Sequence, residues 1–217
     1  NRGVYPRSEW SESALDYYRA TVAAAVPVVL EQLAQGLAEQ GRVVTREPGP
    51  AVKHYSNHAC LTDWRGRVVA DVFWGGQSPH PNVEAKGSCA PAVARILRDR
   101  WEHRPSRLDV KRDATREGLF GEVRAIAGRY AQAFDLRLQD WSNNHPDMGD
   151  TCYLGSRKSQ AFVRIYQPGL KLAQAEDRTG DDIHPDDRNA VRVELQFQPQ
   201  KQPAKTAAAT LSPDELW

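Results

Sequence analysis

The segment GDTCYLGSRKSQAFVRIY, residues 149–166, contains two short runs that are rich in β-forming residues. The two runs, residues 151–156 and 161–166, are separated by a turn that Gly155 and Ser156 favour. The segment therefore predicts a β-hairpin, each strand of which carries a tyrosine.

Two further strand candidates, residues 107–113 and 191–197, carry charges at alternate positions. The strand period of two places these residues on one face of each strand: Arg107, Asp109, Lys111 and Asp113 in the first, and Arg192, Glu194 and Gln196 in the second. Charges on the inner face of a sheet are costly unless they are paired or bind a metal. Two interpretations stay open: an exposed face with arginine–carboxylate pairs, or carboxylates that converge on Mg²⁺ or Mn²⁺.

The rest of the chain alternates predicted strands and helices. Residues 15–22 predict a strand, with a helix over residues 12–26 as the alternative. Further expectations are a helix from Pro27 to about Gly41, a hairpin from residues 54–63 and 68–74, a loop over 77–82, a helix capped by Ser88 that ends near 101–105, a helix over 117–134 and a helical tail from Ala204. This order predicts an α+β fold with a mostly antiparallel central sheet flanked by helices, in which two similar α/β halves could share the sheet.

The composition is that of a globular protein, with 217 residues of which 40% are hydrophobic and 26% are charged. No apolar run approaches the roughly 20 residues that span a bilayer, and the first twenty residues lack the pattern of a secretion signal. We expect a soluble cytoplasmic protein whose residues 1–217 form one domain, a fragment of a longer protein. The three cysteines, Cys60, Cys89 and Cys152, are far apart, so they predict core packing and neither a disulfide framework nor a zinc knuckle.

Charge is unevenly distributed, although the net charge is only +1. Residues 91–130 contain ten Lys and Arg against six Asp and Glu, and residues 151–172 contain four basic residues and no acid. Such stretches can follow a phosphate backbone, although each is also compatible with an ordinary charged surface. Residues 174–188 carry six acids against two arginines and predict a solvated loop.

The hairpin tyrosines, Tyr153 and Tyr166, are candidate nucleophiles if the carboxylates of residues 107–113 and 191–197 bind a metal. The pKa of a free phenol is about 10, so a metal, an arginine or a base must favour the phenolate. Arg157, Lys158 and Arg164 are close in sequence and could hold phosphates and lower that pKa. The alternative is a pair of strand tyrosines that pack their rings.

Residues 149–166 also resemble the signature of the Rep_trans replication initiation factor family. Residues 107–113 resemble the R-x-D-x-x-x-D strand of that family, residues 191–194 its R-x-E strand, and residues 82–101 the helix before the first of these strands. The family includes initiators of rolling-circle plasmids, replication proteins of filamentous phages and relaxases of some integrative conjugative elements. The resemblance covers most of residues 15–200.

The resemblance implies a metal-dependent, site-specific nicking domain that joins DNA to a tyrosine through a 5′-phosphotyrosyl intermediate. It assigns Tyr153 as the nucleophile and Tyr166 as the alternate, and Asp109, Asp113 and Glu194 as ligands of Mg²⁺ or Mn²⁺. Arg157 is the further catalytic candidate, and the DNA-binding candidates are Arg107, Lys158, Arg164 and Arg192. Replacing Asp109 or Glu194 would then cost little stability, because it removes one of several repelling acids.

The chain departs from the family after its second tyrosine, where Gln167-Pro168 stands in place of an acid and a lysine, which puts a role for that lysine in doubt. Alternatives are a conjugative relaxase with the same chemistry and a non-catalytic module that binds origin DNA. Single-stranded or hairpin origin DNA is the expected partner, with a host helicase and a second copy of the chain as further candidates. His54 and His58 are expected to be structural or to face DNA.

Overall fold

The computed structural model describes residues 10–50, 52, 54–142, 145, 147–200, 205 and 208–216. The chain divides into two compact units. We call them the 14–110 unit, which also includes residues 197–217, and the 111–196 unit, which also includes the described residues 10–13. Among the described residues, no helix has the length and apolar character needed to cross a membrane.

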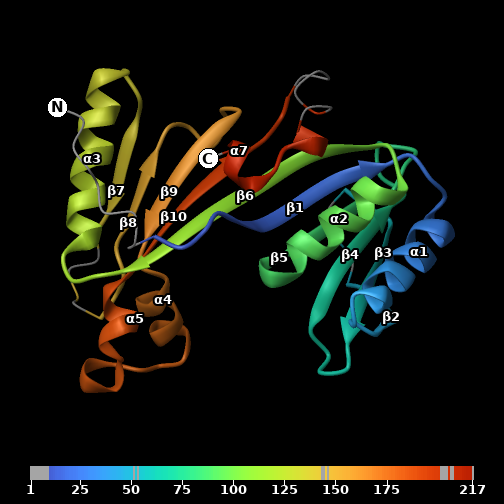
Figure 1. Cartoon of the computed structure of the whole chain (residues 1–217), viewed down its shortest axis with the longest axis horizontal. Helices are drawn as coiled ribbons and strands as arrows, with labels where there is room; N and C mark the ends of the chain where they lie inside the picture. Colours follow the sequence, from blue (N-terminus) through green and yellow to red (C-terminus); the bar gives the residue numbers. More distant parts are fainter. Residues whose placement is uncertain are drawn as a thin grey trace. The chain divides into compact units, whose positions relative to one another are not determined.

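The 14–110 unit packs two helices on one face of an antiparallel sheet (Figure 1). Its strands are β1 (Ala14–Val22), β2 (Val44–Pro48), β3 (Asn57–Asp63), β4 (Val68–Trp74) and β5 (Asn82–Lys86), and its helices are α1 (Val26–Glu39), the 3₁₀ helix η1 (Gly87–Cys89), α2 (Ala90–Arg100) and the short α7 (Pro213–Leu216). A further strand, β6 (His103–Thr115), begins in this unit and ends in the other. The strand order here is β2-β3-β4-β5-β1-β6.

The 111–196 unit has the strand order β6-β10-β9-β8-β7. Its elements are α3 (Leu119–Ala133), β7 (Leu138–Trp141), β8 (Thr151–Leu154), β9 (Ala161–Tyr166), α4 (Pro168–Ala175), the 3₁₀ helix η2 (Gly180–Asp182), α5 (Pro185–Asn189) and β10 (Ala190–Phe197). Helix α3 packs on β7, β8 and β9, and α4 packs on α5.

Alternation along the strands decides which face of each sheet is buried. In the 14–110 unit, Tyr18 and Ala20 of β1 are fully buried with α1 and α2. A Cβ on Gly36 of α1 would lie 2.8 Å from the Ile96 side chain, so this glycine allows α1 and α2 to approach closely. In the 111–196 unit, residues such as Cys152 and Ile165 form the core with α3. Their sequence neighbours therefore lie on the opposite face.

The expected α+β fold with a mostly antiparallel sheet is confirmed, and β6 takes part in the strand order of both units. Residues 15–22 form a strand, so the alternative helix over residues 12–26 is wrong. The hairpins β3–β4 and β8–β9 form where they were predicted. Helix α1 contains Pro27 in its first turn, as expected.

Other expectations need correction. Residues 82–86, expected to belong to a helix, form β5, because Val83 and Ala85 alternate into the core. Cys89 rather than Ser88 precedes α2, and no side chain caps this helix. The acidic stretch over residues 174–188 is not a single loop, since it contains η2 and most of α5. Strands β2 and β7 were not predicted.

The pH dependence of stability should follow His103, which is only 6% exposed at the start of β6. Its Nδ1 lies 3.1 Å from the Trp101 carbonyl, which can only accept, so Nδ1 carries the proton of the neutral ring. Nε2 therefore accepts a hydrogen bond from the Tyr18 hydroxyl at 2.5 Å. Burial lowers the pKa of His103, so the unfolded chain binds the proton more readily than the folded chain. The contribution of His103 to the free energy of unfolding is therefore fully present above the unfolded pKa of about 6.5. As the pH falls below this value, the contribution is lost by at most about 1.4 kcal/mol per pH unit.

Urea unfolding at pH 7 and pH 5 measures this loss. A His103→Phe variant should show a smaller difference between the two pH values than the wild type. Equal differences in the two proteins would show that His103 does not carry the effect.

Candidate functional site

The face of the 111–196 sheet that is turned away from α3 carries most of the expected site residues. We call it the polar face. Alternation places them there because their neighbours Cys152, Ile165 and Val191 are buried under α3. The members of the polar face are Asp113 on β6, Tyr153 on β8, Phe162, Arg164 and Tyr166 on β9, and Arg192 and Glu194 on β10.

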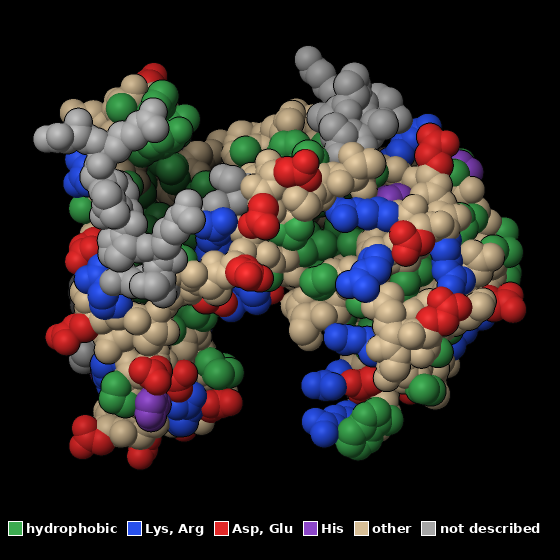
Figure 2. All heavy atoms as spheres, viewed as in Figure 1, with side chains coloured by type: hydrophobic (Ala, Val, Ile, Leu, Met, Phe, Trp, Pro, Cys, Tyr) green, Lys and Arg blue, Asp and Glu red, His purple; other side chains and the backbone are tan. Residues whose placement is uncertain are grey.

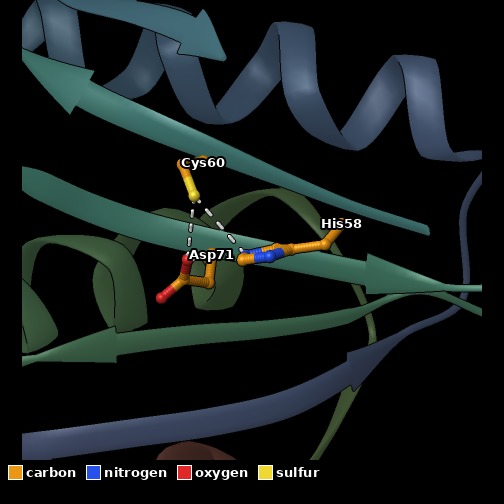
Figure 3. A group of neighbouring side chains, drawn as sticks. All are labelled: His58, Cys60 and Asp71. Carbon is orange, nitrogen blue, oxygen red and sulfur yellow. Dashed lines mark hydrogen bonds and ion pairs between the residues drawn. The ribbon is translucent and has the colours of Figure 1, made fainter. Parts of the chain in front are cut away.

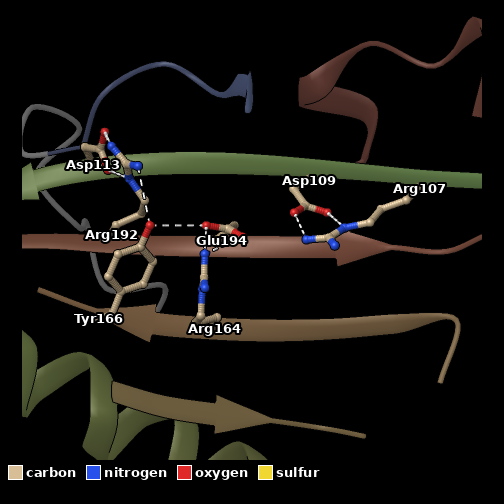
Figure 4. Close-up of polar contacts among 7 residues, drawn as sticks. All are labelled: Arg107, Asp109, Asp113, Arg164, Tyr166, Arg192 and Glu194. Carbon is tan, nitrogen blue, oxygen red and sulfur yellow. Dashed lines mark hydrogen bonds and ion pairs between the residues drawn. The ribbon is translucent and has the colours of Figure 1, made fainter. Parts of the chain in front are cut away.

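Glu194 is the most buried acid of the polar face, with 4% of the residue exposed. The Arg164 Nη2 atom donates to both carboxylate oxygens, at 2.8 Å and 2.6 Å (Figure 4). The Tyr166 hydroxyl donates to Oε2 at 3.3 Å. These bonds offset the cost of burying the carboxylate.

Tyr166 is held by charged groups on several sides. The Arg192 Nη1 atom donates to its hydroxyl at 3.4 Å, and the Arg164 guanidinium and Lys171 ammonium each lie 4.5 Å from the ring centroid. Burial, together with Glu194, raises the pKa of Tyr166, although both arginines oppose the rise. The Tyr166 hydroxyl is therefore held between Glu194 and Arg192.

Tyr153 has a different environment, although it lies on the neighbouring strand. Its ring stacks on Phe162 at a centroid distance of 5.5 Å, and the Arg157 guanidinium lies 4.8 Å from the ring centroid. In register, Tyr153 pairs with Arg164, so the two side chains share a face. Among the described residues, none forms a hydrogen bond with the Tyr153 hydroxyl. This oxygen is thus not engaged in the ion-pair network that holds Tyr166.

Asp113 and Arg192 form a two-point pair on the polar face. Arg192 Nε lies 2.6 Å from Oδ1 of Asp113, and Nη2 lies 2.8 Å from Oδ2. The Asp113 side chain is 40% exposed, so it is the most accessible of the three expected metal ligands.

Asp109 belongs to the 14–110 unit and is only 3% exposed. Arg107 donates from Nε to Oδ1 at 2.8 Å and from Nη2 to Oδ2 (Figure 4). The Arg107 guanidinium also lies 4.3 Å from the Tyr17 ring centroid. All three expected metal ligands are therefore paired with an arginine. Glu194 belongs to the other unit, so a cation shared by Asp109 and Glu194 stays a prediction.

Two of these arginine–carboxylate pairs join neighbouring strands. Arg192 on β10 pairs with Asp113 on β6, and Glu194 on β10 pairs with Arg164 on β9. The other basic candidates, Arg157 and Lys158, are exposed in the turn after β8.

Two residues near these groups were missed in the sequence. Lys171, in the first turn of α4, places its ammonium over Tyr166, and burial and Arg164 lower its pKa. The sequence signal that could have indicated Lys171 is a helix that begins at Pro168, directly after a tyrosine-bearing strand.

Glu84 of β5 is the second missed residue. It is buried beside Lys86, whose Nζ lies 2.8 Å from the Glu84 carboxylate. Alternation with Val83 and Ala85 could have indicated the face on which Glu84 lies.

The acidic stretch over residues 174–188 forms an acidic surface. Acidic side chains gather over the α4–α5 segment (Figure 2). Its two arginines, Arg178 and Arg188, pair with Asp187 and Asp147, respectively. This surface is therefore a poor candidate for contact with a phosphate backbone.

The fold is similar to that of a solved rolling circle replication initiator protein from Geobacillus stearothermophilus. The TM-score is 0.57 and the sequence identity 17%, over 86% of this chain and 74% of that chain. At this identity the likeness establishes the fold alone. A second structure, the regulatory subunit of aspartate kinase from Thermus thermophilus, aligns with a TM-score of 0.21 and 10% identity over 94% of this chain and 98% of that chain, which is too low to support an argument. No family model and no curated protein matches the chain.

Proposed function

We propose that the chain initiates rolling-circle replication by nicking one strand of origin DNA with Tyr153. The observation that carries this proposal is the contrast between the two hairpin tyrosines. Tyr166 is buried, and its hydroxyl is bonded to Glu194 and Arg192. The Tyr153 hydroxyl forms no such bond within the described residues, and Arg157 lies over its ring. The shared fold with a replication initiator supports the assignment.

In the proposed reaction, the Tyr153 oxygen attacks the phosphorus of one phosphodiester. The bond from phosphorus to the 3′ oxygen breaks as the bond to the tyrosine oxygen forms. The phenol loses a proton and the 3′ oxygen gains one, so the products are a 5′-phosphotyrosine and a free 3′-OH. No oxidation occurs, and one ester replaces another. The reverse reaction can therefore rejoin the strand without ATP.

The carboxylates Asp109, Asp113 and Glu194 would hold Mg²⁺ or Mn²⁺ in this proposal. Their oxygens are the hard donors that such ions prefer, and a bound ion would stabilise the negative charge on the attacked phosphate. Arg107 and Arg164 neutralise the two buried carboxylates in the structure. Binding a cation would require these guanidinium groups to turn away, toward the phosphates.

Arg164 has an unsatisfied donor, which favours a movement of its guanidinium toward a phosphate. Its Nε atom is buried and has no hydrogen-bond partner, which typically costs about 1–3 kcal/mol. A phosphate oxygen could accept from it after rearrangement. We therefore assign Arg157 and Arg164 to phosphate contacts near the scissile bond.

Arg157→Ala should weaken DNA binding by a similar factor for unrelated sequences. It removes one phosphate contact, so the slope of log K against log salt should decrease by about 0.7 for single strands. Fluorescence anisotropy with two unrelated single-stranded oligonucleotides over a salt series measures both effects. Arg157 is the cleaner choice, because Arg164→Ala would also leave Glu194 unpaired.

Arg129→Ala is the matched control, since Arg129 is an exposed arginine on α3, which covers the other face of the sheet. It should leave the slope unchanged. An Arg157→Ala protein that keeps the wild-type slope but changes its sequence preference would indicate base reading instead.

Nicking itself is tested with supercoiled DNA that carries the gene of this chain and its flanking sequence. In the presence of Mn²⁺, denaturing electrophoresis should show nicked DNA with protein attached to the broken strand. Binding without strand breakage would favour the non-catalytic module, and breakage without attached protein would indicate a hydrolytic nuclease. A conjugative relaxase would give the same adduct on a transfer origin.

A further inference from the structure

A second group of ligating side chains lies in the 14–110 unit, away from the groups described above. His58 and Cys60 are on β3, and Asp71 is on β4. Cys60 and Asp71 are directly opposite in the antiparallel register, and His58 is two residues before Cys60, so all three lie on one face (Figure 3). Leu61 and Val72, their neighbours in the chain, point into the core under α1 and α2.

Three donor atoms of different chemistry converge in this group. The His58 Nε2 atom lies 2.8 Å from Oδ1 of Asp71, and the Cys60 Sγ atom lies 3.3 Å from the same oxygen and 3.5 Å from Nε2. Zinc bond lengths place tetrahedral ligands roughly 3.3 to 3.6 Å apart. The distance from Sγ to Nε2 already matches, the distance from Sγ to Oδ1 would have to widen by about 0.3 Å, and the distance from Nε2 to Oδ1 by about 0.5 Å.

The His58 ring is oriented by groups outside the cluster. Its Nδ1 atom lies 2.9 Å from the Pro50 carbonyl, which can only accept, so Nδ1 carries the proton and Nε2 points toward Cys60 and Asp71. The ring also stacks on Phe73 at a centroid distance of 4.3 Å. A Cβ on Gly49 would lie 2.1 Å from Nδ1, so only glycine leaves room for the ring here.

Without a cation, each of the two contacts to Oδ1 of Asp71 requires a proton between its atoms. Nε2 needs a proton to donate to Asp71, and the Cys60 thiol donates to the same oxygen. A divalent cation would replace both protons and would be bonded to all three atoms at once.

We propose that His58, Cys60 and Asp71 form a binding site for Zn²⁺. One nitrogen, one sulfur and one oxygen ligand suit zinc, whereas Mg²⁺ and Mn²⁺ prefer oxygen ligands. The site adjoins a surface hollow of about 460 Å³ that His58 and Glu47 help to line. A fourth ligand would be water from this hollow or Glu47, which is opposite Cys60 in register. The proposal is independent of the nicking function.

The test uses the full chain after treatment with a chelator. Co²⁺, added as a spectroscopic probe for zinc, should bind and produce a thiolate-to-cobalt charge-transfer band, and Zn²⁺ should displace it. Bound Zn²⁺ should also protect one cysteine from a thiol reagent. Binding of Co²⁺ without a thiolate band would overturn the proposal, because the carboxylate groups of the candidate nicking site can give no such band.

Variants separate ligands from bystanders. Cys60→Ser and Asp71→Asn should weaken Zn²⁺ binding by at least about tenfold, and Cys60→Ser should abolish the band. Gly49→Ala should weaken binding by displacing the His58 ring. Cys89→Ser, which changes a cysteine outside the cluster, is the matched control and should bind as the wild type does. Circular dichroism checks that each variant is folded, and unchanged affinity in a folded Cys60→Ser protein would refute the site.

Discussion

Tyr153→Phe is expected to bind DNA with wild-type affinity and to form neither a nick nor a covalent adduct. The substitution removes only the attacking oxygen and keeps the ring that stacks on Phe162 and contacts Arg157. Nicking should therefore fall to background, by more than about 10³-fold. Anisotropy measures binding, and denaturing electrophoresis measures the nick and the adduct.

Tyr166→Phe is the matched control, because it makes the same change one strand away. Its buried hydroxyl donates to Glu194, so losing it should cost only about 1 kcal/mol of stability and leave nicking in place. If Tyr166→Phe were the inactive variant, the assignment of Tyr153 would be wrong. If both variants formed the adduct, neither tyrosine would be the nucleophile.

Asp109→Asn and Glu194→Gln are expected to abolish Mn²⁺-dependent nicking while DNA binding persists. Each change removes a negative charge from an oxygen that we assign to the cation, and it keeps the size of the side chain. Nicking assays over a range of Mn²⁺ concentrations measure the loss. An Asp109→Asn protein that nicks normally would contradict the metal assignment and leave the acid as a structural partner of Arg107.

Glu122→Gln is the control for these variants, since Glu122 also pairs with an arginine but lies on α3. It should nick normally. Alanine variants are less suitable at the site, contrary to the expectation that they would cost little stability. Glu194→Ala would leave the half-buried Arg164 without its carboxylate, at a cost of about 2 kcal/mol.

Alternation made the polar strands readable from the sequence. Residues 107–113 and 191–197 carry charges at every second position, and the structure places both segments in strands. The β8–β9 hairpin was readable for the same reason, together with its turn residues. These features are local, so a period of two and a short turn were enough to find them.

Features that depend on neighbouring strands were not readable in this way. The pairing of Arg164 with Glu194 joins residues 30 positions apart, and only the placement of β9 beside β10 brings them together. The short strand β5 was missed because Glu84 and Lys86 disfavour a strand locally, while its partners β1 and β4 stabilise it.

The cluster around Cys60 also has a signature in the sequence. The cysteine was expected in the core, and it is buried, but it lies on the face opposite α1 and α2 and outside the apolar core. The pattern His58-Ala-Cys60 on a predicted strand, with Asp71 on the predicted partner strand, could have placed the three side chains together.

The central claim is tested most directly by identifying the residue that becomes joined to DNA. The adduct formed with supercoiled DNA and Mn²⁺ is digested with nuclease and trypsin and then analysed by tandem mass spectrometry. Trypsin separates the two candidates, because residues 138–157 contain Tyr153 and residues 165–171 contain Tyr166. We predict a nucleotide 5′-phosphate on Tyr153. A nucleotide on Tyr166 or on any other residue, or nicked DNA without a modified peptide, would contradict the account.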